Sequence, residues 1–167
     1  MSSPRRICLI GPESTGKTGL AKALGLPWVP EFAREYVECR GSAGAALCAA
    51  DVEPIARGQI ANLDRATGDV VILDTDLIST VVYARHYYGS CPRWIEEEAR
   101  ARRADLYLLL DTDLAWEEDP VRDGGGDARE DLFDAFRRAL DEFDTRWEIV
   151  SGTFEERLIR ISPFLSF

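Results

Sequence analysis

The residues of this chain with the clearest chemical signature are Gly11-Pro12-Glu13-Ser14-Thr15-Gly16-Lys17-Thr18, which fit the pattern G-x-x-x-x-G-K-[ST]. Glycines in such a loop allow backbone conformations that a Cβ would obstruct. Successive N–H groups can then point inward and bind phosphate oxygens at the positive end of the following helix. Lys17 is expected to reach the β- and γ-phosphates, and the Thr18 hydroxyl to ligate Mg²⁺. The stretch therefore predicts an ATP site formed by Gly11, Glu13, Ser14, Thr15, Gly16, Lys17 and Thr18, with Lys17 also catalytic.

The segments on either side of this loop are those that a phosphate-binding loop requires. Residues 7–10 form a short apolar run typical of a buried strand, and the apolar residues of 17–24 recur at helical spacing. A strand, a glycine-containing turn and a helix therefore follow one another in the order of a P-loop.

The rest of the chain continues this alternation of strands and helices. Strands are expected near 6–10, 70–73, 106–110 and 148–150, with a short extended piece at 27–30. Helices are expected from about 31, from 51, and over 77–88, 94–103, 132–143 and 154–161. This pattern predicts one α/β domain over 1–167, a three-layer P-loop NTPase with a central parallel sheet of about five strands. Ligands of such folds bind at the carboxyl ends of the strands.

Two carboxylates follow the predicted strand 70–73. Asp74 comes directly after the apolar run, which is the position of a second acidic anchor for Mg²⁺ beside Thr18. Asp76 begins the next helix, so it either caps that helix or binds a substrate hydroxyl. The sequence leaves open how the two carboxylates divide these roles.

A second group of candidates follows the extended piece at 27–30. Glu31 could take a proton from an attacking hydroxyl and hold a sugar with Arg34 nearby, or it could simply suit the first turn of a helix. Trp28 and Trp116 lie near strand ends, where either could stack on a flat ring or serve only as packing.

Three consecutive glycines, 124–126, predict a flexible loop over 119–129. Arg122 and Arg129 bracket this run. In a small mobile lid of about 119–130 they would close over ATP and neutralise charge on the transferring phosphoryl group, although two exposed arginines are the simpler alternative.

Composition limits the classes of partner. The net charge of −10 argues against a nucleic-acid partner, because phosphate backbones select clustered lysine and arginine. No apolar run reaches the length of a membrane span, and the four cysteines lack C-x-x-C spacing. We therefore expect a cytoplasmic protein that binds neither nucleic acid nor membrane. The sequence leaves open whether the protein forms a homo-oligomer.

With these motifs in hand, the chain resembles the ribosylnicotinamide kinase domain of NadR-type proteins and the stand-alone P-loop ATPases grouped with them. The resemblance extends over nearly the whole chain. The matching segments are 11–18, Trp28-Val29-Pro30-Glu31-Phe32-Ala33-Arg34-Glu35-Tyr36, Ile55-Ala56-Arg57-Gly58-Gln59, Asp74-Thr75-Asp76, Gly89-Ser90-Cys91-Pro92, 105–109, and Trp116 with Asp119-Pro120-Val121-Arg122.

The resemblance implies a phosphotransferase that makes nicotinamide mononucleotide from nicotinamide riboside and ATP, with Mg²⁺ as cofactor. It implies that Glu31, Arg34, Gln59 and Asp76 lie near the riboside, with Trp28 or Trp116 against the pyridine ring. Catalytic roles fall on Lys17, Asp74, Glu31, Arg122 and Arg129. The alternatives are a kinase for another nucleoside or nucleotide, and a P-loop ATPase or switch that acts through a partner protein.

Overall fold

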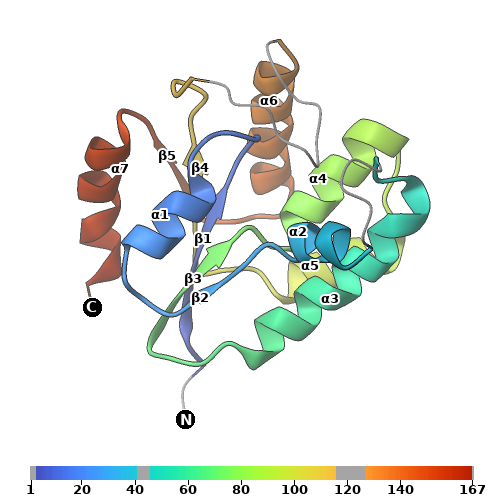
Figure 1. The fold of residues 1–167 in the computed structure, drawn as a ribbon, viewed down its shortest axis with the longest axis horizontal. Helices are drawn as coiled ribbons and strands as arrows, with labels where there is room; N and C mark the ends of the chain where they lie inside the picture. Colours follow the sequence, from blue (N-terminus) through green and yellow to red (C-terminus); the bar gives the residue numbers. More distant parts are fainter. Residues whose placement is uncertain (1–2, 41–45, 116–126, 167) are drawn as a thin grey trace.

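The computed structural model describes residues 3–40, 46–115 and 127–166. Its centre is a sheet of five parallel strands in the order β2-β3-β1-β4-β5 (Figure 1). The strands are β1 (Arg5–Ile10), β2 (Trp28–Val29), β3 (Val70–Asp74), β4 (Leu106–Leu110) and β5 (Trp147–Val150). The expected α/β fold with a central parallel sheet is confirmed.

Helices connect these strands and cover both faces of the sheet. They are α1 (Lys17–Ala23), α2 (Phe32–Cys39), α3 (Val52–Arg65), α4 (Leu77–Tyr88), α5 (Arg93–Ala101), α6 (Asp127–Glu142) and α7 (Phe154–Ile161). Short 3₁₀ turns, η1 (Ala49–Asp51) and η2 (Ser162–Leu165), precede α3 and follow α7.

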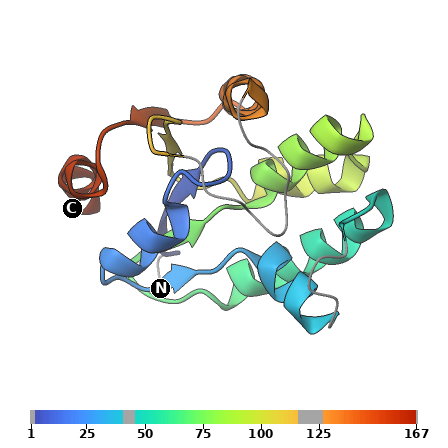
Figure 2. The ribbon, with the colours of Figure 1, turned by 45° about the horizontal axis from the view of Figure 1, so that its top comes forward.

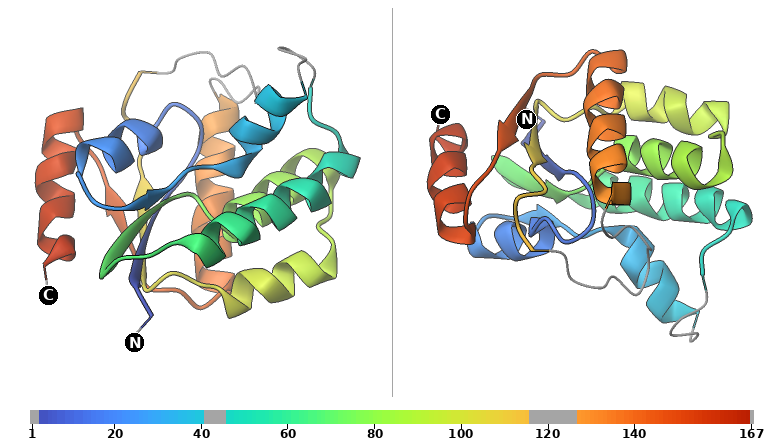
Figure 3. Two further views of the ribbon diagram at one scale, coloured as in Figure 1. Left: turned by 60° about the horizontal axis from the view of Figure 1, so that its bottom comes forward. Right: turned by 90° about the horizontal axis from the view of Figure 1, so that it is seen from above.

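Two hydrophobic clusters fix the layers. Ile7 and Leu9 of β1 pack with α1 and α7, whereas Cys8 and Ile10 of the same strand belong to the cluster that includes α3, α4, α5 and α6. Figures 2 and 3 show α1 and α7 side by side, with α3, α4 and α5 gathered on the opposite side of the sheet. Because both faces are covered, β1, β3 and β4 are near-continuous apolar runs rather than alternating ones.

The parallel arrangement brings four strand ends to one edge of the sheet. The Thr75 amide after β3 donates to the Leu9 carbonyl of β1 at 3.0 Å, and the Asp111 amide after β4 donates to the Val150 carbonyl of β5 at 3.0 Å. The loops after β1, β3, β4 and β5 therefore lie at the same edge, which is where ligands bind in open α/β sheets.

One expectation about the chain between β4 and β5 is wrong. The loop was expected to include residue 129, but α6 begins at Asp127, so residues 127–130 are helical. Leu132 and Phe136 follow Arg129 by three and seven residues, so all three side chains lie on the buried face of α6. The acidic Glu130 is favourable in the first turn of the helix, where the helix dipole is positive. Residues 116–126, with most of the expected lid, are outside the described ranges. Within those ranges, no helix is both long and apolar enough to cross a membrane.

A buried carboxyl group joins the β3–α4 turn to β4. Asp76 accepts the Ile78 amide at 2.9 Å as the cap of α4, and it accepts the Tyr107 hydroxyl at 2.5 Å. Burial raises the pKa of Asp76 to about 6, although these hydrogen bonds favour the charged form. Both oxygens are thus committed to the fold.

Asp76→Asn is expected to change how stability depends on pH. An acid with a higher pKa in the folded state keeps its proton to a higher pH there. The burial cost of the Asp76 carboxylate is therefore absent below its ordinary pKa of 3.8 and grows as the pH rises through about 6. The Asn variant should therefore gain about 2–3 kcal/mol over wild type between pH 4 and pH 8. Urea unfolding across this range measures the difference, with exposed Asp69→Asn as the control. A variant that is less stable than wild type at every pH contradicts the expectation.

Gly58 of α3 permits the close approach of α2. A Cβ at this position would lie 2.0 Å from the Phe32 ring. The next residue, Gln59, accepts the Phe32 amide at 2.9 Å, so this contact also sets the distance between the two helices.

Gly58→Ala is expected to lower the free energy of unfolding by about 1–2 kcal/mol, because the Phe32 ring must leave its position. Gly19→Ala in α1 is the matched control, since its Cβ would meet only the Phe154 ring at 3.3 Å. Both variants gain helix propensity, so their difference in urea unfolding isolates the steric effect. Equal stabilities of the two variants would show that α2 and α3 tolerate a larger separation.

Candidate nucleotide and acceptor site

The loop between β1 and α1 has the backbone of a phosphate cradle. Gly11 has φ +142°, and a Cβ there would lie 2.9 Å from the Leu110 carbonyl oxygen. Gly16 caps α1 in the left-handed conformation, with φ +86°. The Thr15 hydroxyl donates to the Pro12 carbonyl at 2.8 Å, which holds the turn closed. Two of the predicted loop positions thus require glycine on backbone grounds.

Lys17 lies folded over this loop. Its Nζ donates to the Gly11 carbonyl at 2.8 Å and to the Pro12 carbonyl at 2.5 Å, and the residue is buried. The ammonium group is therefore held at the loop, from which it can reach a phosphate bound by the loop amides.

The two predicted metal ligands contact each other directly. The Thr18 hydroxyl donates to Asp74 Oδ2 at 2.6 Å, and the other oxygen, Oδ1, is buried without a hydrogen-bond partner among the described residues. Burial raises the pKa of Asp74, and the charge of Glu31 raises it further, while Thr18 and Lys17 lower it. A cation at Oδ1 would satisfy this oxygen and favour the carboxylate form.

This pair of ligands suits Mg²⁺ better than an ion that needs a full protein cage. In the described part of the chain, no three His, Cys, Asp or Glu side chains form a metal cluster. Mg²⁺ binds through one or two protein oxygens, with phosphates and water completing its octahedron. Thr18 and Asp74 therefore fit the ion that the sequence predicts.

Glu13 and Arg129 place opposite charges beside the loop. The Glu13 carboxylate is buried, and neither oxygen has a hydrogen-bond partner among the described residues. Arg129 donates to the Leu114 carbonyl at 3.1 Å and to the Ser14 carbonyl at 3.4 Å. Burial lowers the pKa of Arg129, and the charge of Glu13 raises it. Arg129 is thus close to the loop, as predicted, but on a helix.

A cavity of about 290 Å³ adjoins this site. Its walls come from α2, the segment before α3, α3 and α4, and are mainly apolar or aromatic. The lining residues are Glu31, Ala33, Ala46, Leu47, Cys48, Asp51, Val52, Ile55, Gln59, Thr75, Ser79, Thr80, Tyr83, Ala84, Tyr87 and Tyr88. The rings of Tyr83 and Tyr87 are stacked, with centroids 6.0 Å apart and planes within 5°. Such a cavity can take a small ligand with one flat face.

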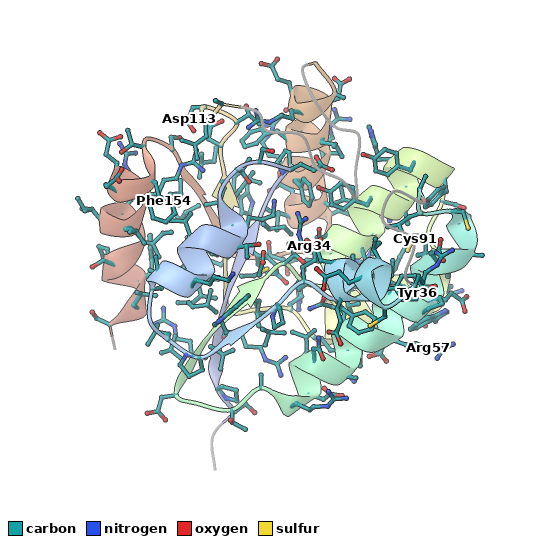
Figure 4. All side chains as sticks on the ribbon, in the orientation of Figure 1. Arg34, Tyr36, Arg57, Cys91, Asp113 and Phe154 are labelled. Atoms are coloured by element: carbon teal, nitrogen blue, oxygen red, sulfur yellow. The ribbon has the colours of Figure 1, made fainter. Side chains whose placement is uncertain are left out.

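Glu31 is one of two carboxylates among the described residues that line this cavity, the other being Asp51. Glu31 is 6% exposed and pairs with Arg34, whose Nε lies 3.2 Å from Glu31 Oε2. Figure 4 shows Arg34 near the middle of the molecule, with Tyr36 of the same helix farther out. Arg34 does not line the cavity, and its ion pair with Glu31 links it to this space.

Among the buried polar atoms of the cavity residues, Gln59 Nε2 and Ser79 Oγ lack hydrogen-bond partners in the described part of the chain. The Oε1 atom of Gln59 accepts the Phe32 amide, which fixes the amide group and leaves its donor for a ligand. Gln59 was predicted as a substrate residue, whereas Ser79 was not.

Thr75 connects the two sites through an unusual backbone. It has φ +67°, which is strained for a β-branched residue, and it lies between Asp74 and Asp76 while lining the cavity. Strain of this kind is retained where the surrounding structure requires it, often at ligand sites.

Several predicted acceptor residues lie elsewhere. Trp28 packs against the cluster under α1 and α7 and does not line the cavity, which agrees with the packing alternative and not with stacking on a ring in this cavity. Asp76 is a cap and a partner of Tyr107, and it is also absent from the lining. Trp116 and Arg122 are outside the described residues.

The sequence analysis did not identify several other residues of the site. Tyr83 and Tyr87 are four residues apart, a spacing that also fits plain helix packing, so it gives little signal. Arg157 of α7 gives a clearer sequence signal, because this charged residue falls in the apolar stripe of Phe154, Leu158 and Ile161. It is fully buried and donates to the Thr15 carbonyl at 2.7 Å.

Known proteins share both the sequence pattern and the fold. The trifunctional NAD biosynthesis/regulator protein NadR of Escherichia coli is 29% identical over 131 residues, a match that covers 72% of this chain and 32% of that protein. The chain thus spans about a third of the length of this curated relative. The resemblance to NadR-type proteins that the motifs indicated is confirmed.

Solved structures give the same result for the fold. A NadR protein in complex with NAD and AMP-PNP has a TM-score of 0.69 at 25% identity, covering 95% of this chain and 48% of that one. A NadR protein in complex with NR has a TM-score of 0.70 at 23% identity, covering 96% and 48%. The thymidylate kinase of Ehrlichia chaffeensis has a TM-score of 0.67 at 14% identity, covering 99% and 100%, and shares the fold alone.

A family model described as an AAA domain, AAA_28, matches residues 6–157. Since these residues make up most of the chain and include the loop, Asp74 and the cavity, this protein belongs to the AAA domain family AAA_28.

Proposed function

We propose that this protein is an ATP- and Mg²⁺-dependent kinase that phosphorylates the 5′-hydroxyl of nicotinamide riboside to give nicotinamide mononucleotide. The observation that carries the proposal is the position of Glu31. This residue lines the cavity and at the same time raises the pKa of Asp74, the partner of Thr18. An acceptor hydroxyl beside Glu31 would therefore lie close to the phosphate and metal site, as in-line transfer requires.

The nucleotide end of the site follows from the loop. The amides of residues 11–18 and the Lys17 ammonium would bind the phosphates of ATP, and Thr18 with Asp74 would hold Mg²⁺. When bound, the ion would neutralise charge on the phosphates. Arg129 lies at the Ser14 carbonyl, from which its charge can act on the same phosphates, and Arg122 is the second candidate for this role.

The acceptor end favours an uncharged or cationic molecule. Two carboxylates, Glu31 and Asp51, line the cavity, and none of its described lining residues is lysine, arginine or histidine. A nucleoside monophosphate would bring its own negative charges to this space without a basic partner. A pyridinium ring could instead lie against Tyr83 and Tyr87 with favourable cation–π contact. The solved NadR protein in complex with NR supports the same choice.

In the proposed mechanism, Glu31 accepts a hydrogen bond from the 5′-hydroxyl and takes its proton as the oxygen attacks the γ-phosphorus of ATP. The bond from this phosphorus to the bridging oxygen breaks, and ADP leaves. Arg34 orients the Glu31 carboxylate through their 3.2 Å ion pair. Gln59 Nε2 and Ser79 Oγ supply donors to polar groups of the riboside.

ATP consumption by the purified protein with Mg²⁺ is expected to rise strongly when nicotinamide riboside is added, with a mononucleotide as product. Ordinary nucleosides and thymidine monophosphate form the control panel. Stimulation by another nucleoside would keep the mechanism and replace the substrate. ATP hydrolysis that no acceptor changes would instead indicate a P-loop ATPase or switch that acts through a partner protein.

Glu31→Gln is expected to lower the acceptor-dependent rate by about 10²-fold or more, because the amide cannot take the hydroxyl proton. ATP binding should change little, since Glu31 lies on the acceptor side. Glu35→Gln, on the next turn of α2 and exposed, is the matched control and should keep the wild-type rate. Equal rates for the two variants would remove Glu31 from the mechanism.

A further inference from the structure

Arg157 is a fully buried arginine whose guanidinium group contacts three separate loops. Its Nη1 donates to the Thr15 carbonyl at 2.7 Å, its Nη2 to the Asp111 carbonyl at 3.0 Å, and its Nε to the Gly152 carbonyl at 2.8 Å. Nη2 also pairs with the Asp113 carboxylate. These partners follow β1, β4 and β5, so one side chain joins the ends of three strands.

The charge of this guanidinium is well compensated. A buried cation is costly unless a counter-charge and hydrogen bonds replace its water. Asp113 supplies the counter-charge, and it accepts the Gly152 amide at 2.6 Å as well, so the carboxylate is itself held in place. Figure 4 shows Asp113 near the end of α7 that carries Phe154. The planar fork of arginine suits three acceptors in different directions, which the single ammonium of lysine does not.

The contact with Thr15 completes a pattern in the phosphate loop. The carbonyls of Gly11 and Pro12 accept from Lys17, that of Ser14 from Arg129, and that of Thr15 from Arg157. A peptide unit points its N–H and its C=O in opposite directions. Each carbonyl fixed by a cation therefore fixes the direction of the neighbouring amide, and Thr15 precedes the amide of Gly16 at the start of α1.

We propose that Arg157 is a positioning residue for the nucleotide site, which sets the orientation of the loop amides by holding the Thr15 carbonyl. It acts through the backbone and need not touch the nucleotide. Its effect on ATP rests on the proposed function, whereas its effect on the loop does not.

The test uses Arg157→Met, which keeps an unbranched apolar stem and removes every side-chain donor, and Arg157→Lys, which keeps the charge. In the nucleotide-free protein, hydrogen–deuterium exchange of the amides in 11–18 should rise roughly tenfold or more in the Met variant and less in the Lys variant. The dissociation constant for ATP should rise by a similar factor, and the KM for the acceptor should stay unchanged.

Two controls separate positioning from general stability. Arg160→Met removes an exposed arginine from the same helix and should change neither measurement. Leu140→Ala opens the other hydrophobic cluster and should lower global stability without a selective rise of exchange in 11–18. If Arg157→Met leaves exchange in the loop unchanged, or if Leu140→Ala reproduces the rise, the proposal is wrong.

Two further outcomes are decided by the same experiment. If Arg157→Met does not fold, Asp113→Asn removes the counter-charge and should give a smaller rise in the same amides; no rise overturns the proposal. If the wild-type protein does not bind ATP, the proposed function fails, and the exchange of 11–18 still decides whether Arg157 orders the loop.

Discussion

The site depends on one constraint, the polarity of the peptide units between β1 and α1. Amides that face a phosphate leave their carbonyls facing protein, and buried carbonyls must find donors. Here the donors are the side chains of Lys17, Arg129 and Arg157, which come from α1, α6 and α7. The helices around the loop therefore do more than pack against the sheet, because each carries a cationic side chain that donates to a carbonyl of the loop.

Buried acidic side chains also gather at this edge of the sheet. Glu13, Glu31, Asp74 and Asp76 are all nearly inaccessible to solvent, and burial raises the pKa of Asp74 and Asp76. Hydrogen bonds offset the cost of burying a carboxylate to a different extent in each group. Asp76 is satisfied by Ile78 and Tyr107, whereas Glu13 and one oxygen of Asp74 have no hydrogen-bond partner within the described residues. Asp76 thus has a structural role, whereas Asp74, two residues earlier, and Glu13 are suited to bind a ligand.

Much of this was readable from the sequence, because it depends on local patterns. The phosphate loop, the apolar strands and the acid after β3 are each fixed by neighbouring residues, and the structure places Thr18 and Asp74 in contact as expected. The face on which a two-residue strand presents Trp28 depends on its partner strand, which no local pattern gives. The aromatic wall of Tyr83 and Tyr87 and the anchoring by Arg157 arise only when distant segments pack together.

The contact between Arg157 and Thr15 also bears on the order in which the protein matures. The two residues are 142 positions apart, so the loop is bound by a helix that is synthesised much later than the loop itself. Closing so long a segment costs entropy that the docking of α7 must offset. During translation, β1 and α1 can therefore associate early while the Thr15 carbonyl still lacks its partner. The Thr15 carbonyl gains its partner only when α7 docks, so the last contact of the phosphate loop is a tertiary one.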